Sequence, residues 1–159
     1  MSISKADLPK NTSTSGEMTA DLNELGKFEG EAFKFETDKK HVIFMGKHPI
    51  SPTEWNYMSL TFQIDIVNGR HFFNSNSEAA PPLFSEISNN GNSGKPYPAK
   101  PDEGYVDITF DKENGTLEAA FNYTFEHNSR QVVGNIVNGQ GMEYVKILPE
   151  IGESSLKLQ

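Results

Sequence analysis

The residue types that could carry out catalysis or bind a metal are present in this sequence, but they form no recognisable catalytic or metal-binding pattern. The four histidines all stand more than four residues apart: His41, His48, His71 and His127. Metal ligands on one strand or helix usually recur two or four residues apart. No serine lies in the G-x-S-x-G pattern that presents a nucleophile, and the chain has no cysteine. We therefore predict no catalytic residue, no metal site and no cofactor, and we expect a protein without enzymatic activity rather than an enzyme.

Short acidic segments give no stronger indication of chemistry. Residues 111–115 read DKENG and resemble the start of a calcium loop. The alternating ligands and the distal glutamate of an EF-hand do not follow. Asp102 and Glu103 stand together in a polar segment, whereas general acid catalysis usually needs a carboxyl group that is buried away from water. A hairpin turn accounts for residues 111–115.

Aromatic residues next to predicted loops are better candidates, because a rigid ring with a polar tip suits recognition. Trp55 follows a segment broken by prolines, and Tyr97 lies between Pro96 and Pro98. Proline fixes φ near about −65°, so Tyr97 would be presented to a ligand with little loss of entropy. We predict ligand-binding residues at Trp55, Tyr57, Tyr97 and Tyr105. The alternative, that these rings cover one end of the domain or pin a loop to it, stays open.

The elements that must position these rings show the two-residue period of β-strands. Leu60, Phe62 and Ile64 alternate with polar residues, and Phe33 and Phe35 are expected to share one face of an earlier strand. The dipeptides at 68–69 and 138–139 are both Asn-Gly, which is typical of two-residue hairpin turns. Adjacent hairpins with one apolar face predict an all-β fold, either an antiparallel barrel or a two-sheet sandwich of about eight strands.

The length of 159 residues predicts a single domain. Residues 1–26 are polar and are expected to form a flexible N-terminal arm. Residues 27–149 would form the antiparallel β domain, with a long loop at 74–103 that is rich in Pro, Gly and Asn. Residues 150–159 would form a C-terminal tail.

The net charge of −8 constrains the partners. Nucleic acids and anionic membrane surfaces are bound mainly by Lys and Arg, so we expect no nucleic-acid partner. No stretch approaches 18 apolar residues, which predicts no membrane insertion. The N-terminus lacks the apolar run of a signal peptide. We therefore expect a cytoplasmic protein, or one exported without a classical signal peptide. The oligomeric state is left open.

The segments NGTLEAAFNYTF (114–125) and VVGNIVNGQGMEYVKI (132–147) resemble the closing hairpins of small all-β domains found on bacterial surface lipoproteins. In both, a glycine-containing turn precedes a strand of alternating apolar residues. The chain differs from that family in having no lipidation cysteine and no export signal. The resemblance implies an all-β fold and no particular activity.

These observations favour a non-catalytic binding protein that recognises a carbohydrate or a protein surface through its loop aromatics. Two alternatives remain. The first is an acidic immunity or inhibitor-type partner of a basic protein, suggested by the charge. The second is a small β-barrel enzyme or carrier with an interior apolar pocket for a hydrophobic ligand.

Overall fold

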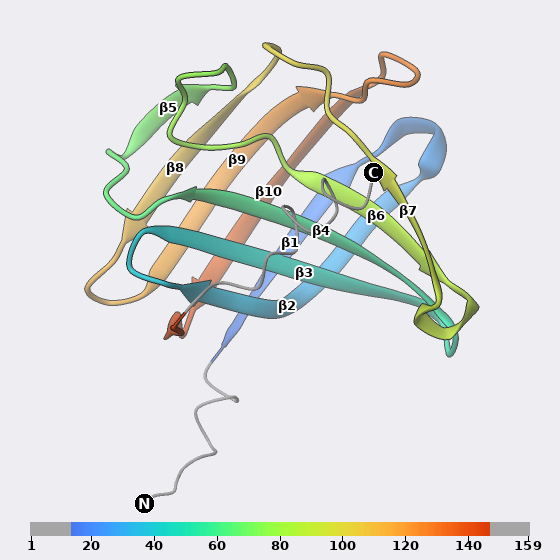
Figure 1. Ribbon diagram of the computed structural model, residues 1–159, viewed down its shortest axis with the longest axis horizontal. Coiled ribbons are helices and arrows are strands. Elements are labelled where there is room, and N and C mark those ends of the chain that lie inside the picture. The colour runs from blue at the N-terminus through green and yellow to red at the C-terminus, as the bar shows by residue number, and fades with distance from the viewer. Residues whose placement is uncertain (1–13, 147–159) are drawn as a thin grey trace, which may run out of the picture.

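The computed structural model describes residues 14–146, which form one strongly curled sheet with the shape of a half-barrel (Figure 1). The strands are β1 (Ser15–Asp21), β2 (Lys27–Thr37), β3 (His41–Ser51), β4 (Glu54–Gln63), β5 (Gly69–Phe72), β6 (Leu83–Ser88), β7 (Ser93–Tyr97), β8 (Tyr105–Asp111), β9 (Thr116–Thr124), β10 (Gln131–Gln140) and β11 (Glu143–Tyr144). Their order is β5-β8-β9-β10-β1-β2-β3-β4-β6-β7, with every neighbouring pair antiparallel. The all-β, antiparallel prediction is confirmed.

One short strand and two 3-10 turns complete this arrangement. β11 runs parallel to β2 and pairs with Glu36 and Thr37. Two 3-10 turns, η2 (Asn23–Leu25) and η3 (Asn89–Gly91), are the helical elements of the described residues. Within the same residues, no helix is long and apolar enough to cross a membrane.

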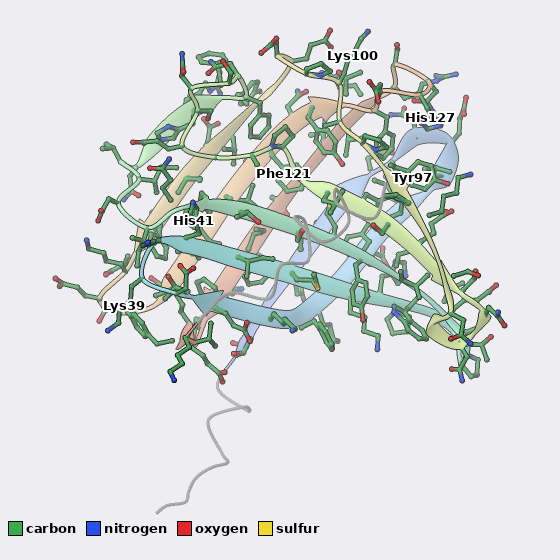
Figure 2. All side chains as sticks on the ribbon, viewed as in Figure 1. Lys39, His41, Tyr97, Lys100, Phe121 and His127 are labelled. Carbon is green, nitrogen blue, oxygen red and sulfur yellow. The ribbon has the colours of Figure 1, made fainter. Side chains whose placement is uncertain are left out.

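The concave side of the sheet holds the core, as the alternation predicts. Leu60 is fully buried and Phe62 is 1% exposed, whereas the intervening Thr61 is only half-buried. The rings that fill the interior contact one another edge to face or at a tilt: Phe28, Phe84, Tyr97, Phe121, Tyr123 and Phe125. Figure 2 labels Phe121, which lies on β9. This burial is the main stabilising contribution to a single curled sheet.

Contacts across the curl hold the sheet in its rounded shape. After β7, Ala99 forms a bridge with Phe125, and the Lys100 amide donates to the Thr124 carbonyl at 2.7 Å. Just after β8, the Lys112 ammonium lies 2.8 Å from the carboxylate of Asp65, which follows β4. Segments that follow strands of opposite halves of the sheet therefore meet, so the sheet curls rather than extending flat.

Two hairpins have turns organised by an aspartate, and one of them is the turn predicted at residues 111–115. Residues 38–40 connect β2 to β3, and the Asp38 carboxylate accepts hydrogen bonds from the Lys40 and His41 amides at 2.9 and 2.8 Å. Residues 112–115 connect β8 to β9, where Asp111 accepts from the Glu113 and Asn114 amides. In both turns an aspartate side chain satisfies backbone donors that the sheet leaves unpaired.

Both predicted Asn-Gly hairpin turns are wrong. β4 pairs with β6, and β5 pairs with β8, so residues 68–69 connect strands that are not neighbours. The Asn68 side-chain carbonyl instead accepts from the Phe110 amide at 2.9 Å. Asn138 and Gly139 lie inside β10, where the register with β1 and β9 shifts. At both positions long-range strand pairing overrides the local turn preference.

The predicted arm and loop also contain strands. β1 falls within the residues expected to be a flexible arm, and residues 1–13 lie outside the described part of the chain. The segment 74–103 holds β6, β7 and η3 rather than one loop. The expected tail at 150–159 lies outside the described residues. The described strands number eleven, more than the eight expected. The additional strands are short or carry few apolar residues, so their alternation is hard to recognise in the sequence.

Candidate functional site

Trp55 and Tyr57 lie side by side on the convex, outer face of β4. Met58 and Leu60 are fully buried in the core, so the residues of odd number on this strand point outward. Tyr57 is the register partner of Lys47 on β3 and of Ser85 on β6. The structure thus places two of the four predicted ligand-binding residues on one surface.

A β-bulge in β2 adds a third ring to this surface. The register between β2 and β3 shifts between Ala32 and Lys34, which leaves Phe33 as the extra residue. Phe35 is buried in the core, whereas Phe33 is 45% exposed and its ring lies 5.5 Å from that of Tyr57. The prediction that Phe33 and Phe35 share a face is wrong, because the bulge reverses the alternation between them.

Lys47 joins the three rings into one group. Its ammonium lies 4.7 Å from the centre of the Trp55 ring and 5.4 Å from that of Phe33. Both distances are within the range of cation–π attraction. We call Phe33, Lys47, Trp55 and Tyr57 the outer-face aromatic cluster.

The Trp55 ring is held in place but its polar atom is unused. An added Cβ on Gly91 would lie 3.6 Å from Cη2 of Trp55, so η3 packs against the ring. The indole Nε1 is buried and has no hydrogen-bond partner among the described residues. A buried donor without a partner costs free energy, about 1–3 kcal/mol.

Tyr97 lies elsewhere, and the proline-flanked segment does not present it to solvent. The residue belongs to β7, is 4% exposed and packs on Phe84, with ring centres 5.4 Å apart. Its hydroxyl donates to the Glu86 carboxylate at 2.7 Å, and its ring lies 5.3 Å from that of His127 (Figure 2). Burial and this hydrogen bond raise the pKa of Tyr97 to about 12. These contacts make Tyr97 part of the core.

Tyr105 is a third, separate location. It lies on β8, where the Arg70 guanidinium stacks on its ring at 3.9 Å. Arg70 also donates two hydrogen bonds to Asp107, at 2.8 and 3.0 Å, and these lower the pKa of that carboxyl group. The guanidinium therefore already occupies one face of Tyr105.

No protein-family model, curated protein or solved structure matches this chain. The resemblance to domains of bacterial surface lipoproteins accordingly stays a prediction. The described residues contain no group of three His, Asp or Glu side chains with the geometry of a metal site.

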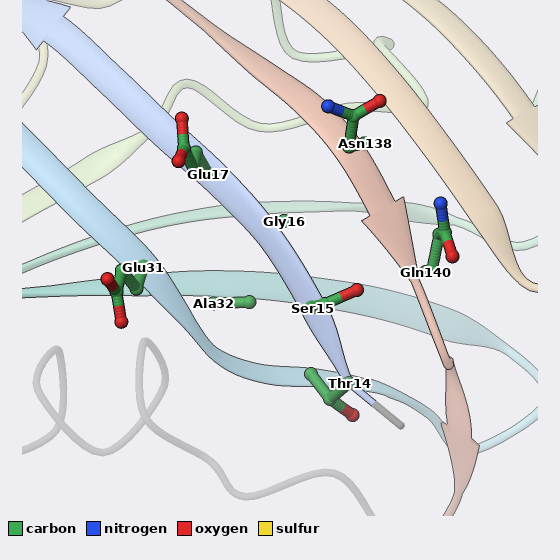
Figure 3. A pocket seen from close by; sticks show the side chains of 8 residues that line it. All are labelled: Thr14, Ser15, Gly16, Glu17, Glu31, Ala32, Asn138 and Gln140. Atoms are coloured by element: carbon green, nitrogen blue, oxygen red, sulfur yellow. The ribbon is translucent and has the colours of Figure 1, made fainter. Parts of the chain in front are cut away.

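A shallow polar pocket of about 420 Å³ lies where β1, β2 and β10 meet (Figure 3). Eight residues line it: Thr14, Ser15, Gly16, Glu17, Glu31, Ala32, Asn138 and Gln140. Glu31 links the two surfaces, because it is the register partner of Glu17 on one side and of Lys47 on the other.

Sequence reasoning found half of the cluster and none of the pocket. Phe33 and Lys47 carry no signal of their own, since the bulge that turns Phe33 outward has no signature in the surrounding residues. The Asn-Gly dipeptide at 138–139 was the available signal for the pocket. It marks a bulge rather than a turn, and both structures need a residue with positive φ.

Proposed function

We propose that this protein is a non-catalytic binding protein whose ligand, a carbohydrate or a protein surface, rests on the outer-face aromatic cluster. The observation that carries the proposal is the composition of this outer face. The solvent face of an antiparallel sheet is normally polar, yet three aromatic rings gather on it around one lysine. Aromatic side chains are enriched where proteins bind ligands, because each buries a large area with few rotatable bonds.

Trp55 makes this proposal directly testable, because it is the only tryptophan in the chain. Fluorescently labelled protein is applied to a glycan array and to a peptide array. Each ligand that binds is then titrated while the intrinsic emission of Trp55 is followed. We expect a shift or quenching of this emission, and a loss of binding in Tyr57→Ala and Phe33→Ala.

The matched control is Phe72→Ala. Phe72 is 60% exposed and contacts Tyr105 edge to face, away from the cluster. We expect this variant to bind as the unchanged protein does. Equal binding by Phe33→Ala, Tyr57→Ala and the unchanged protein would refute the proposal. It would also be refuted if neither the glycan array nor the peptide array contained a ligand.

A second candidate is an acidic partner of a basic protein. It is favoured by Glu17 and Glu31, which face each other across β1 and β2, and by the net charge of −8. Binding to a labelled lysine-rich peptide is measured at low and at high salt. This candidate requires binding that weakens steeply with salt and that is lost in a Glu17→Lys, Glu31→Lys double variant. Binding that does not respond to salt excludes it.

The interior offers less support for a hydrophobic ligand. The rings of Phe84, Phe125 and Tyr123 contact one another directly across the concave side. Packing of this kind is typical of a solid core rather than of a carrier cavity.

A further inference from the structure

We propose that the polar pocket and the outer-face aromatic cluster form one site for a neutral oligosaccharide, with the sugar hydroxyls in the pocket and an apolar sugar face on the rings. The inference rests on the proposed function and selects carbohydrate as the ligand class. It is carried by the construction of the pocket, by its hydrogen-bonding groups and by the balance of charge along the combined surface.

The pocket is built at a bulge that the fold tightly constrains. Asn138 and Gly139 on β10 lie opposite the single residue Gly16 on β1. Asn138 has φ 58° and Gly16 has φ 128°. A Cβ added to Gly16 would lie 2.9 Å from the Asn138 carbonyl oxygen. The close approach of the two backbones therefore requires glycine here, and bulges of this kind are common beside functional sites.

The lining of the pocket matches a ligand that both donates and accepts hydrogen bonds. The Asn138 and Gln140 amides offer donors and acceptors, and the two carboxylates accept only. Ala32 contributes the only carbon-only side chain among the lining residues. A purely apolar ligand would leave most of these groups without partners, whereas sugar hydroxyls would satisfy them. The volume of about 420 Å³ falls within the range of small-molecule sites.

Glu17 and Glu31 are exposed carboxylates of the pocket that are free to accept hydrogen bonds from a ligand. They are direct cross-strand partners, and neither has a hydrogen-bond or ion-pair partner within residues 14–146. Like charges opposite each other in a sheet destabilise it. Hydroxyl donors placed between the two carboxylates would make charge-assisted hydrogen bonds, which are about twice as strong as neutral ones.

The charge of the combined surface indicates that the ligand is neutral. Glu17 and Glu31 place two carboxylates at the pocket, and Lys47, the register partner of Glu31, places one ammonium group at the cluster. The two parts of the surface therefore carry opposite charges. A strongly anionic ligand would be repelled at the pocket, and a strongly cationic one at Lys47.

The test uses soluble neutral oligosaccharides of glucose, xylose, mannose, galactose and N-acetylglucosamine, three to six units long, titrated against the intact chain up to millimolar concentrations. Binding is read from the emission of Trp55. We expect at least one oligosaccharide to bind. We also expect a Glu31→Ala, Gln140→Ala double variant to bind at least tenfold more weakly, a loss of about 1.4 kcal/mol.

Glu126→Ala is the matched control, because Glu126 lies far from the pocket. It follows the end of β9, whereas the pocket lies near the start of β9, where Leu117 pairs with Gly139. Urea unfolding of each variant shows that it is folded. The tenfold loss is expected only in the pocket variant, and unchanged oligosaccharide binding in that variant overturns the inference.

The remaining outcomes separate this inference from the proposed function. If the oligosaccharide is lost in Tyr57→Ala but retained in the pocket variant, the pocket has no part in binding and the proposed function stands. Binding of tetralysine that is lost in Glu31→Ala, with no oligosaccharide bound, would assign the pocket to a cation and overturn the inference. The proposed function fails if the cluster variants bind glycans and peptides as the unchanged protein does, or if no ligand is found on the glycan and peptide arrays.

Discussion

At the scale of single residues, two tyrosines on the concave side differ in one hydrogen bond. Tyr123 is fully buried, and its hydroxyl has no partner in the described part of the chain. Tyr97 is nearly as buried, but its hydroxyl donates to Glu86 at 2.7 Å. An unsatisfied buried hydroxyl lowers stability, whereas a satisfied one contributes a little. Removing the two hydroxyls should therefore have opposite effects.

Tyr123→Phe is expected to increase the free energy of unfolding by about 1 kcal/mol, because the substitution removes a desolvated hydroxyl and keeps the ring. Tyr97→Phe should lower it by about the same amount, because Glu86 loses its donor. Urea unfolding, followed by far-UV circular dichroism, measures both. A clear loss of stability in Tyr123→Phe would show that its hydroxyl has a partner in solution.

The raised pKa of Tyr97 predicts a dependence of stability on alkaline pH. Burial and the neighbouring Glu86 carboxylate raise the pKa to about 12 in the folded protein, against an ordinary value of about 10. The folded state thus favours the protonated form. Its contribution is complete below about pH 10 and is lost as the pH rises towards the folded value. The unfolding midpoint should therefore fall over this window less steeply in Tyr97→Phe than in the unchanged protein.

At the scale of elements, the bulge between β1 and β10 decides whether the pocket exists. Gly16 and Gly69 have nearly the same backbone angle, φ 128° and φ 133°. They differ in surroundings, since an added Cβ meets nothing within 4 Å at Gly69 but lies 2.9 Å from Asn138 and Gly139 atoms at Gly16. Substitution at Gly69 therefore measures the cost of backbone strain alone, and substitution at Gly16 measures that strain plus the close contact between β1 and β10.

Gly69→Ala is expected to cost about 1 kcal/mol, the penalty for a side chain at positive φ. Gly16→Ala should cost more, about 2–4 kcal/mol, because the two strands must also move apart. The difference between the two urea midpoints measures the contact alone. Similar costs at both sites would mean that β1 and β10 separate freely and that the pocket has no fixed shape.

The same elements show how far the sequence reaches. Alternation of apolar residues correctly predicts β4, β8 and β9, because burial of one face of a strand leaves a two-residue period. β1 shows the same two-residue period, because Met18 and Ala20 alternate with polar residues. Its polar composition nevertheless suggests a flexible arm. Composition is a weaker guide than periodicity in so short a segment.

The candidate site was harder to predict, because it depends on pairing between distant strands. Trp55 and Tyr57 share a face by simple alternation and could be predicted together. Phe33 joins them only through a bulge, and Lys47 only through the register of β2, β3 and β4. Tyr97 was misjudged, because its flanking prolines suggested an exposed segment, while its pairing with Phe84 turns the ring inward.

At the scale of the whole molecule, one curled sheet must cover its own apolar face. Strands from the two ends of the sheet therefore meet through interior rings rather than through backbone pairing alone. Phe84 on β6 makes several of these contacts. Its ring lies 6.0 Å from Phe28, 5.4 Å from Tyr97 and 6.1 Å from Phe125. Tyr97 belongs to the neighbouring strand β7, whereas Phe28 on β2 and Phe125 after β9 lie far along the sheet.

Phe84→Ala is expected to lower the free energy of unfolding by about 3–5 kcal/mol, since it removes a fully buried ring and leaves a cavity between strands that cannot easily collapse. Phe72→Ala, at a ring 60% exposed, should cost less than about 1 kcal/mol. Both are measured by urea unfolding at the pH of highest stability. If the two losses were similar, the interior rings would not hold the curl, and the sheet would need another source of closure. A large loss at Phe84 alone would show that the rounding of the sheet, and with it the convex surface that displays the aromatic cluster, is stabilised from the inside.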